Sequence, residues 1–275
     1  IADYTFCDCD NLASVEIKDG VEYIGDYAFN GCGNLSDITL PDTVTGIGSG
    51  VFDGTAYCKD ENNFDNGVLY IGNHLVKADT SISGVCTVRN GTKIICNYAF
   101  AHCDSLTNIN LPDSLTVIGS YSFQSSGLTD ITIPQSVTVI GDSAFAVCVD
   151  LTNITVADGN TAYRSQNGIL YNKAKTEIIC YPKAAVGDSF AIPNGVTKIA
   201  DSAFERCWNL KNITIPYGVT NIGTDAFNNC KALENIVIPD GVESIGAGAF
   251  FECSALKSVT IPNSVASIGE SAFMK

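Results

Sequence analysis

The sequence is poor in positive charge and lacks long apolar runs, and each shortage excludes a class of function. Lysine and arginine total 15 residues against 30 aspartates and glutamates, which gives a net charge of −15. Such a chain repels polyanions, so we expect it to bind neither nucleic acid nor an anionic membrane surface. No apolar run approaches the roughly 20 residues of a membrane-spanning helix, so we expect no spanning segment.

Residues suited to catalysis are also scarce. The chain has two histidines, His74 and His102, and a Ser-His-Asp or Cys-His site would need partners that the fold brings close to one of them. The glycines recur as turns and form no phosphate-binding motif. A zinc site needs convergent cysteine clusters, and Cys7-Asp8-Cys9 has no second pair. We therefore predict that the protein is not an enzyme, with no catalytic residue, no cofactor and no bound metal.

What the sequence has in abundance is a repeat with a period of 23 residues. A phenylalanine marks each unit, at Phe6, Phe29, Phe52, Phe100, Phe123, Phe145, Phe204, Phe227, Phe250 and Phe273. A period of about 20 to 29 residues with leucine-type apolar positions indicates a leucine-rich-repeat solenoid, in which stacked units share a continuous core. We therefore predict a β-rich leucine-rich-repeat solenoid, with residues 1–275 forming one elongated domain.

Each unit predicts two short strands and a turn. At Ile213-Thr214-Ile215, apolar and polar residues alternate and β-branched residues dominate, which indicates a strand. Pro216 ends it, because proline cannot donate to a ladder. A second extended piece follows at Val219 to Ile222, and Gly223 is expected to turn the chain. We expect Asp225-Ala226-Phe227 to begin a short helical turn.

Two segments depart from the repeat, at about 53–89 and 158–191. In each, an Asn-Gly turn leads into one strand and a second strand follows: Asn66–Tyr70 with His74–Val76, and Asn167–Tyr171 with Glu177–Tyr181. Asn-Gly before an apolar run indicates a tight turn, so we predict a β-hairpin insertion at both places. Each hairpin is either a purely structural insertion or part of a binding site, since insertions in repeat proteins often lie on one face.

The unit from Leu233 to Cys253 reads L-E-N-I-V-I-P-D-G-V-E-S-I-G-A-G-A-F-F-E-C. It resembles the BspA-like leucine-rich repeats, which are found mainly in bacterial surface proteins, and the resemblance covers nearly the whole chain. It implies display at the cell surface and, as for some members, adhesion to host proteins or to other cells. The family shares no catalytic residues, so the resemblance implies no active site.

The chain contains 12 cysteines, and most of them follow the repeat. Seven stand three residues after a phenylalanine, at Cys9, Cys32, Cys103, Cys148, Cys207, Cys230 and Cys253. We interpret them as a ladder of reduced, inward thiols that contact backbone groups, because free cysteine behaves as a small buried apolar residue. Cys58 and Cys86 flank the first hairpin, and a disulfide between them remains open.

The ends of the sequence suggest part of a longer protein. Met274 is the only methionine, and Ile1 enters in the middle of a unit, where it corresponds to Ile24. We expect a signal peptide and an anchor outside this segment and an extracellular or cell-surface location. Open ends make end-to-end self-association possible, because solenoids need polar capping coils for solubility.

Two sets of residues are candidates for binding. The outward positions of the main strands form a polar face: Asp37, Thr39, Asn108, Asn110, Asp130, Thr132, Asn153, Thr155, Asn212 and Thr214. Aromatic residues gather near the hairpins: Phe64, Tyr70, Tyr163, Tyr171 and Tyr181. We predict a non-catalytic recognition or adhesion module for an extracellular protein. The alternatives are a structural stalk that presents another domain, and a glycan-binding repeat domain.

Overall fold

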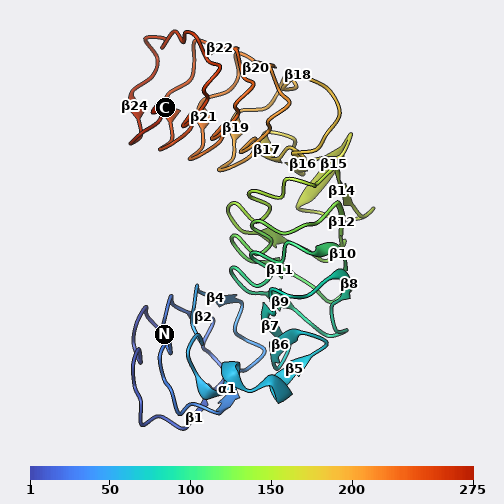
Figure 1. Ribbon diagram of the computed structural model, residues 1–275, viewed down its shortest axis with the longest axis vertical. Helices are drawn as coiled ribbons and strands as arrows, with labels where there is room; N and C mark the ends of the chain where they lie inside the picture. Colours follow the sequence, from blue (N-terminus) through green and yellow to red (C-terminus); the bar gives the residue numbers. More distant parts are fainter.

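The computed structural model describes residues 1–275, which form a β-solenoid of about 11 coils that curves into an arc (Figure 1). Each regular coil places one strand on the outer side of the arc and a shorter strand on the inner side. Both termini lie on the same side of the view, at the open side of the arc. The predicted solenoid and its period of about 23 residues are confirmed.

Parallel pairing stacks each repeat position on itself. The outer strands are β1 (Ser14–Glu16), β3 (Asp37–Thr39), β8 (Gly84–Thr87), β10 (Leu106–Asn110), β12 (Asp130–Ile133), β14 (Asn153–Val156), β18 (Ser189–Ala191), β20 (Asn212–Thr214) and β22 (Asn235–Val237). The inner strands are β2 (Tyr23–Ile24), β4 (Gly46–Ile47), β9 (Ile94–Ile95), β11 (Val117–Ile118), β13 (Val139–Ile140), β19 (Lys198–Ile199), β21 (Asn221–Ile222), β23 (Ser244–Ile245) and β24 (Ser267–Ile268). Ile213, for example, pairs with Ile236 in the next coil.

The repeated phenylalanines form stacks in the core. The ring centroids of Phe100 and Phe123 lie 5.4 Å apart, and those of Phe123 and Phe145 lie 5.6 Å apart. Phe123 is 0% exposed, whereas Phe6 in the first coil is 38% exposed and stacks on Phe29 alone. Full burial of such a side chain stabilises the fold by about 1.5–3 kcal/mol, so the stacks are a major part of the core.

The turn that carries each phenylalanine is not the predicted turn of helix. In one such turn the backbone φ is 53° at Asp225 and 60° at Asn229, which is left-handed geometry that no right-handed helix contains. Between them, the Phe227 N–H donates to the carbonyl of Ala249 in the next coil, at 2.8 Å. Helices occur only at α1 (Ala56–Lys59) and the 3₁₀ turn η1 (Glu61–Asn63), both inside the first insertion.

The repeated glycine before this turn is required for close packing and not for turning. Gly223 has no positive φ, but a Cβ atom there would lie 2.7 Å from the backbone nitrogen of Asp201 in the preceding coil. Gly246 is as crowded, with the backbone nitrogen of Thr224 at 2.4 Å from the same position. Only glycine therefore allows adjacent coils to approach this closely.

Both predicted hairpin insertions are confirmed, and each contains a further strand. The first is an antiparallel meander of β5 (Phe64–Asp65), β6 (Val68–Ile71) and β7 (His74–Ala78), and the second consists of β15 (Tyr163–Gln166), β16 (Ile169–Asn172) and β17 (Glu177–Cys180). The last strand of each meander pairs in parallel with the inner ladder, β7 with β9 and β17 with β19. Each insertion therefore begins a new section of inner ladder.

The middle strand of each meander is buried on both faces. In β6, Val68 and Tyr70 belong to one hydrophobic cluster, whereas Leu69 and Ile71 belong to another. In β16, Leu170 likewise faces a different cluster from its two neighbours. These strands therefore separate three successive cores, and the arc bends where the insertions lie (Figure 1). That all three cores form a single domain stays a prediction.

Most of the predicted cysteine ladder is buried and contacts backbone carbonyls, but Cys9 in the first coil is exposed, so the prediction is wrong for that residue. The thiols of Cys32 and Cys148 donate to the carbonyls of Phe6 and Phe123, each at 2.9 Å. Cys230 and Cys253 make the same bond to the phenylalanine carbonyl of the preceding coil, each at 3.1 Å. All 12 cysteines are free, including the buried Cys58 and Cys86, which lie in different hydrophobic clusters and form no disulfide.

We predict that Phe123→Ala lowers the free energy of unfolding by about 3–5 kcal/mol, because it removes a ring packed on both faces. Phe6→Ala should cost less than half of that, since Phe6 is half-exposed and has one stacking neighbour. Urea unfolding of both variants and the parent chain measures the difference. Equal losses for the two variants would contradict the stacking account.

The buried thiols should be unreactive in the folded chain. Burial raises the pKa of the Cys103 and Cys148 thiols from the usual 9.0 to about 12. At about pH 8, where a thiol of ordinary pKa is partly ionised, we expect a thiol reagent to modify only exposed Cys9 and partly buried Cys7 rapidly. Denatured chain should react at all 12 cysteines, and Cys9→Ser should remove one rapid site; more than two rapid sites would contradict the ladder.

The same thiols predict how stability depends on pH. Their folded-state pKa exceeds the unfolded value, so the folded chain holds these protons more tightly. The free energy of unfolding should keep the full contribution of these thiols below about pH 9 and fall as the pH rises toward about 12. Urea titrations across this range measure the fall.

Candidate functional site: the polar outer face

The outer strands present alternate side chains to solvent, as the alternation in the sequence predicts. In β12, Ile131 is buried, whereas Asp130 and Thr132 are exposed. The predicted face residues all lie on this outer side, and all but the half-buried Asn108 are exposed: Asp37, Thr39, Asn108, Asn110, Asp130, Thr132, Asn153, Thr155, Asn212 and Thr214. Their exposure is confirmed, while their role in binding stays a prediction.

Hydrogen bonds between coils hold part of this face in place. The side-chain amide of Asn108 donates to the carboxylate of Asp130 at 3.2 Å, and that of Asn110 donates to the hydroxyl of Thr87 at 3.0 Å. The outer ladder is nevertheless interrupted, since β1–β3, β8–β10, β12–β14 and β18–β20–β22 form separate sheets. The face therefore consists of several short polar sheets that follow the curve of the arc.

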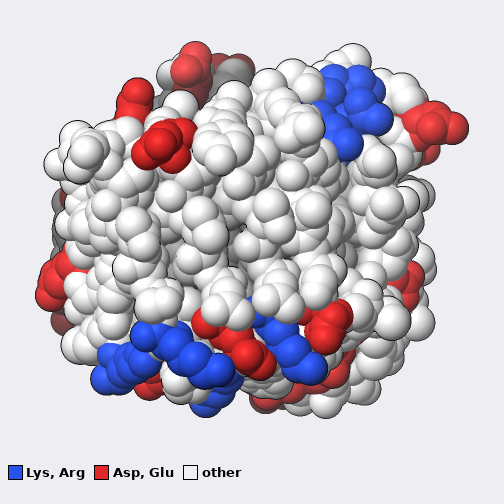
Figure 2. All heavy atoms as spheres, turned by 90° about the horizontal axis from the view of Figure 1, so that it is seen from above, with Lys and Arg blue, Asp and Glu red and all other residues white.

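The sheet β18–β20–β22 carries an apolar feature within this polar face. Tyr217 is 81% exposed and Val237 is 74% exposed. Together with Asn212, Thr214 and Asn235 they line a shallow hollow of about 340 Å³. Figure 2 looks onto this end of the molecule and shows a central area without charged side chains, bordered by Lys, Arg, Asp and Glu. The arrangement offers hydrogen-bonding groups around an exposed aromatic ring.

Tyr217 is not among the residues predicted from the sequence, although the repeat contains a signal for it. Most units place a short polar residue after the proline that ends the outer strand, such as Asp42, Gln135 or Asp240. Tyr217 replaces that residue with a large aromatic one, and Val237 stands where neighbouring units have threonine. A comparison of each unit with the others would have found both departures.

The prediction that five hairpin aromatics form a binding surface is wrong for three of them. Tyr70, Tyr171 and Tyr181 are 6%, 1% and 5% exposed. They fill the core where the insertions interrupt the phenylalanine stack; the ring of Tyr181, for example, lies 5.2 Å from that of Phe204. They are therefore core residues and cannot contact a partner. Phe64 and Tyr163 are only partly buried and remain candidates.

The two histidines occupy separate structural positions, and the buried titratable groups around Lys183 surround an ammonium that donates to the carbonyls of Ser202 and Ala203. His74 is 1% exposed, and its ring nitrogens lie 3.1 Å from the backbone carbonyls of Ile71 and Val44, so it serves as a core residue. His102 is exposed on a turn. No three His, Cys, Asp or Glu side chains lie close enough together to hold a metal ion. None of the helices has the length and apolar character to cross a membrane.

Comparisons with known proteins agree with this architecture. The sequence pattern of the BspA type leucine rich repeat region matches residues 1–87, 71–186 and 180–275. A leucine rich cell surface protein from Faecalibacterium prausnitzii, known from its crystal structure, is 30% identical over 100% of this chain and 79% of its own, with a TM-score of 0.59. The resemblance inferred from the sequence is therefore confirmed.

A second solved structure supports the fold alone. The pneumococcal vaccine antigen PcpA is 22% identical over 96% of this chain and 67% of its own, with a TM-score of 0.63. A search of curated proteins finds no match.

Proposed function

The chain belongs to the BspA-type leucine-rich repeat family, and from this premise we propose that it is a non-catalytic recognition module of a bacterial cell-surface protein. It binds an extracellular protein through the outer side of its C-terminal coils. The cell-surface description of the relative from F. prausnitzii supports the location, and membership of a repeat family supports a role without catalysis.

The observation that carries the proposal is the pair of exposed apolar side chains on the β18–β20–β22 sheet. Tyr217 and Val237 line one hollow and are 81% and 74% exposed. Tyrosine is enriched in the energetic centres of interfaces because it combines a rigid apolar ring with a hydroxyl. The surrounding Asn212, Thr214 and Asn235 supply the polar rim that such a centre needs.

The charge of the chain restricts the kind of partner. The net charge is −15, and on this end of the molecule charged groups of both signs border an uncharged area (Figure 2). A protein with a neutral or basic contact surface meets less repulsion than an acidic one. Because the contact area is small, the affinity at one site is modest, and multivalent display on a cell surface increases it.

We predict that Tyr217→Ala weakens binding to the partner by about 1–2 kcal/mol, roughly tenfold. Val237→Thr should also weaken binding, by a smaller factor than Tyr217→Ala. The measurement is a binding screen of immobilised extracellular-matrix proteins and a glycan array, followed by titration of each hit with the parent and the variants. Both residues are exposed, so neither substitution should change the free energy of unfolding by more than about 0.5 kcal/mol.

Val85→Thr is the matched control, since Val85 is 62% exposed on the outer strand β8 and lies outside the hollow. Its affinity should equal that of the parent chain. Hits that bind all variants equally would contradict the proposed site. A screen without any hit, on folded protein, would favour the structural stalk, and hits confined to the glycan array would favour a glycan-binding domain.

A further inference from the structure

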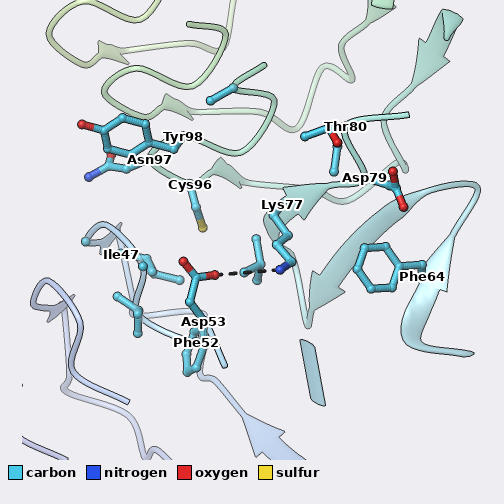
Figure 3. Close-up of a pocket in the computed structure, with 16 residues that line it drawn as sticks. Ile47, Phe52, Asp53, Phe64, Lys77, Asp79, Thr80, Cys96, Asn97 and Tyr98 are labelled. Carbon is cyan, nitrogen blue, oxygen red and sulfur yellow. Dashed lines mark ion pairs between the residues drawn. The ribbon is translucent and has the colours of Figure 1, made fainter. Parts of the chain in front are cut away.

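Each insertion lies beside a cavity enclosed by two successive turns of the solenoid. The first corner cavity, of about 430 Å³, lies between the turn at Phe52–Asp53 and the turn at Asn97–Tyr98. Figure 3 shows these turns, with Lys77 of β7 reaching toward Asp53. The second corner cavity, of about 370 Å³, is built in the same way beside the second insertion. Both volumes fall in the range of ligand sites, about 300–1,000 Å³.

A shortened coil causes both cavities. In a regular coil, the phenylalanine follows the inner-strand isoleucine by five residues, as Phe227 follows Ile222. In the first insertion the equivalent pair is Leu75 and Ala78, because the Ala78 N–H makes the inter-coil bond of a phenylalanine, to Ala99 at 2.6 Å. The separation is then three residues, so the chain connects the two positions by a shorter path and forms no projecting turn.

The second insertion is shortened by the same amount. Ile178 pairs with Ile199 of the inner ladder, and the Tyr181 N–H donates to the carbonyl of Ala203 at 2.9 Å. Tyr181 therefore takes the phenylalanine position three residues after Ile178. The turns before and after both insertions project beyond the shortened coil and form opposite walls of the cavity.

The wall that precedes each cavity carries backbone donors without acceptors. In regular coils the phenylalanine N–H donates to the next coil, as Phe29 does to the carbonyl of Val51 at 3.0 Å. The N–H groups of Phe52 and Phe145 have no acceptor in the chain, although these residues are 1% and 3% exposed. Buried N–H groups without a partner are rare in folded proteins, and these two occur at equivalent places.

The opposite wall carries backbone acceptors without donors. In a regular coil, the carbonyl that follows the phenylalanine accepts a bond from the preceding coil, as that of Asn30 does from Asp8 at 2.8 Å. The equivalent carbonyls are Ala101 in the first cavity and Glu205 beside the second, and no group of the chain donates to either. The first corner therefore presents a donor from one turn and an acceptor from the next. In the second corner the equivalent acceptor lies beside the cavity, and a segment bound there displaces the hydrogen bond that the Ser143 hydroxyl donates to the Ser202 hydroxyl at 3.1 Å between the two turns.

We infer that each corner cavity binds a short extended segment of a partner polypeptide, which lies between the two turns as an additional rung. A polypeptide backbone is the ligand that offers carbonyls and N–H groups on opposite edges. Its carbonyls accept from Phe52 or Phe145, and its N–H groups donate to the carbonyls of the following turn. This is recognition by added main-chain hydrogen bonds, in which neighbouring side chains supply the specificity.

Charge selects a basic segment over a free anion. The first cavity is lined by Asp53 and Asp79 against the single Lys77. The second is lined by three carboxylates, those of Asp142, Glu177 and Asp201, against the single Lys198. An anion at the free N–H groups would be repelled, whereas a lysine or arginine next to the bound backbone would be attracted. Phe64 and Tyr163 line the two cavities and add apolar contact.

The test begins with selection of a displayed library of short linear peptides on the whole chain. Selected peptides should be rich in lysine and arginine. The double variant Thr80→Trp/Thr138→Trp places an indole on the exposed rim of each cavity and should lower the affinity of the selected peptides by about tenfold or more. Thr45→Trp/Thr107→Trp is the matched control, at exposed positions outside both cavities, and should bind as the parent chain does.

Amide hydrogen exchange identifies the contact. Bound peptide should slow exchange of the Phe52 and Phe145 amides and leave the already bonded Phe123 amide unchanged. A selection that yields no binder, peptides that bind the blocked variant as tightly as the parent, or unchanged exchange at both amides would overturn the proposal. A dimer of this chain that the blocking variant dissociates would assign the cavities to a second copy and would also overturn it. Because Tyr217 lines neither cavity, its variants test the proposed function separately.

Discussion

The backbone hydrogen bonds of one coil are completed by the next coil, and the rest of the structure depends on this constraint. In the phenylalanine turn, residues two before and two after the phenylalanine are left-handed, and every second N–H points along the stack, as in the bond from Phe227 to Ala249. The identical turn must then lie directly above, which places phenylalanine on phenylalanine and cysteine beside the preceding carbonyl. Sequence period, core and thiol ladder are consequences of that one requirement. Stability accordingly accumulates from contacts between neighbouring coils.

The insertions satisfy part of this constraint and leave part of it unmet. The meander continues the inner ladder through β7 and β17, and the two-sided burial of β6 and β16 joins one core to the next. The shortened coil, however, offers one N–H bond where a full turn offers three. The insertion with its shortened coil therefore accounts for both the bend in the arc and the cavity walls whose backbone groups lack hydrogen-bond partners.

The sequence predicts the structural features that recur from unit to unit. Period, strand positions, Asn-Gly hairpins and the thiol ladder all follow from residue type at fixed spacing. The left-handed turn does not, because residues as different as Val147, Arg206 and Asn229 adopt it, so tertiary bonds and not local preference determine it. The burial of Tyr70 and Tyr171 was equally hidden, since a strand buried on both faces has no alternation to reveal which side is solvent. The exposed face residues were predictable, and Tyr217 required a comparison between units.

Binding sites in such a molecule are to be sought where the repeat is broken. A regular coil completes its hydrogen bonds along the stack in the phenylalanine turn. Its outer strand presents asparagine side chains that already bond to neighbouring coils. Because coils interact only with their neighbours, a departure in one coil costs stability locally and leaves the remaining stack intact. At Tyr217 and Val237 the side chains differ from those of the regular repeat, and at the two corner cavities the backbone differs from it. The same local independence that lets the solenoid tolerate these irregularities makes them the places where it has interactions to offer a partner.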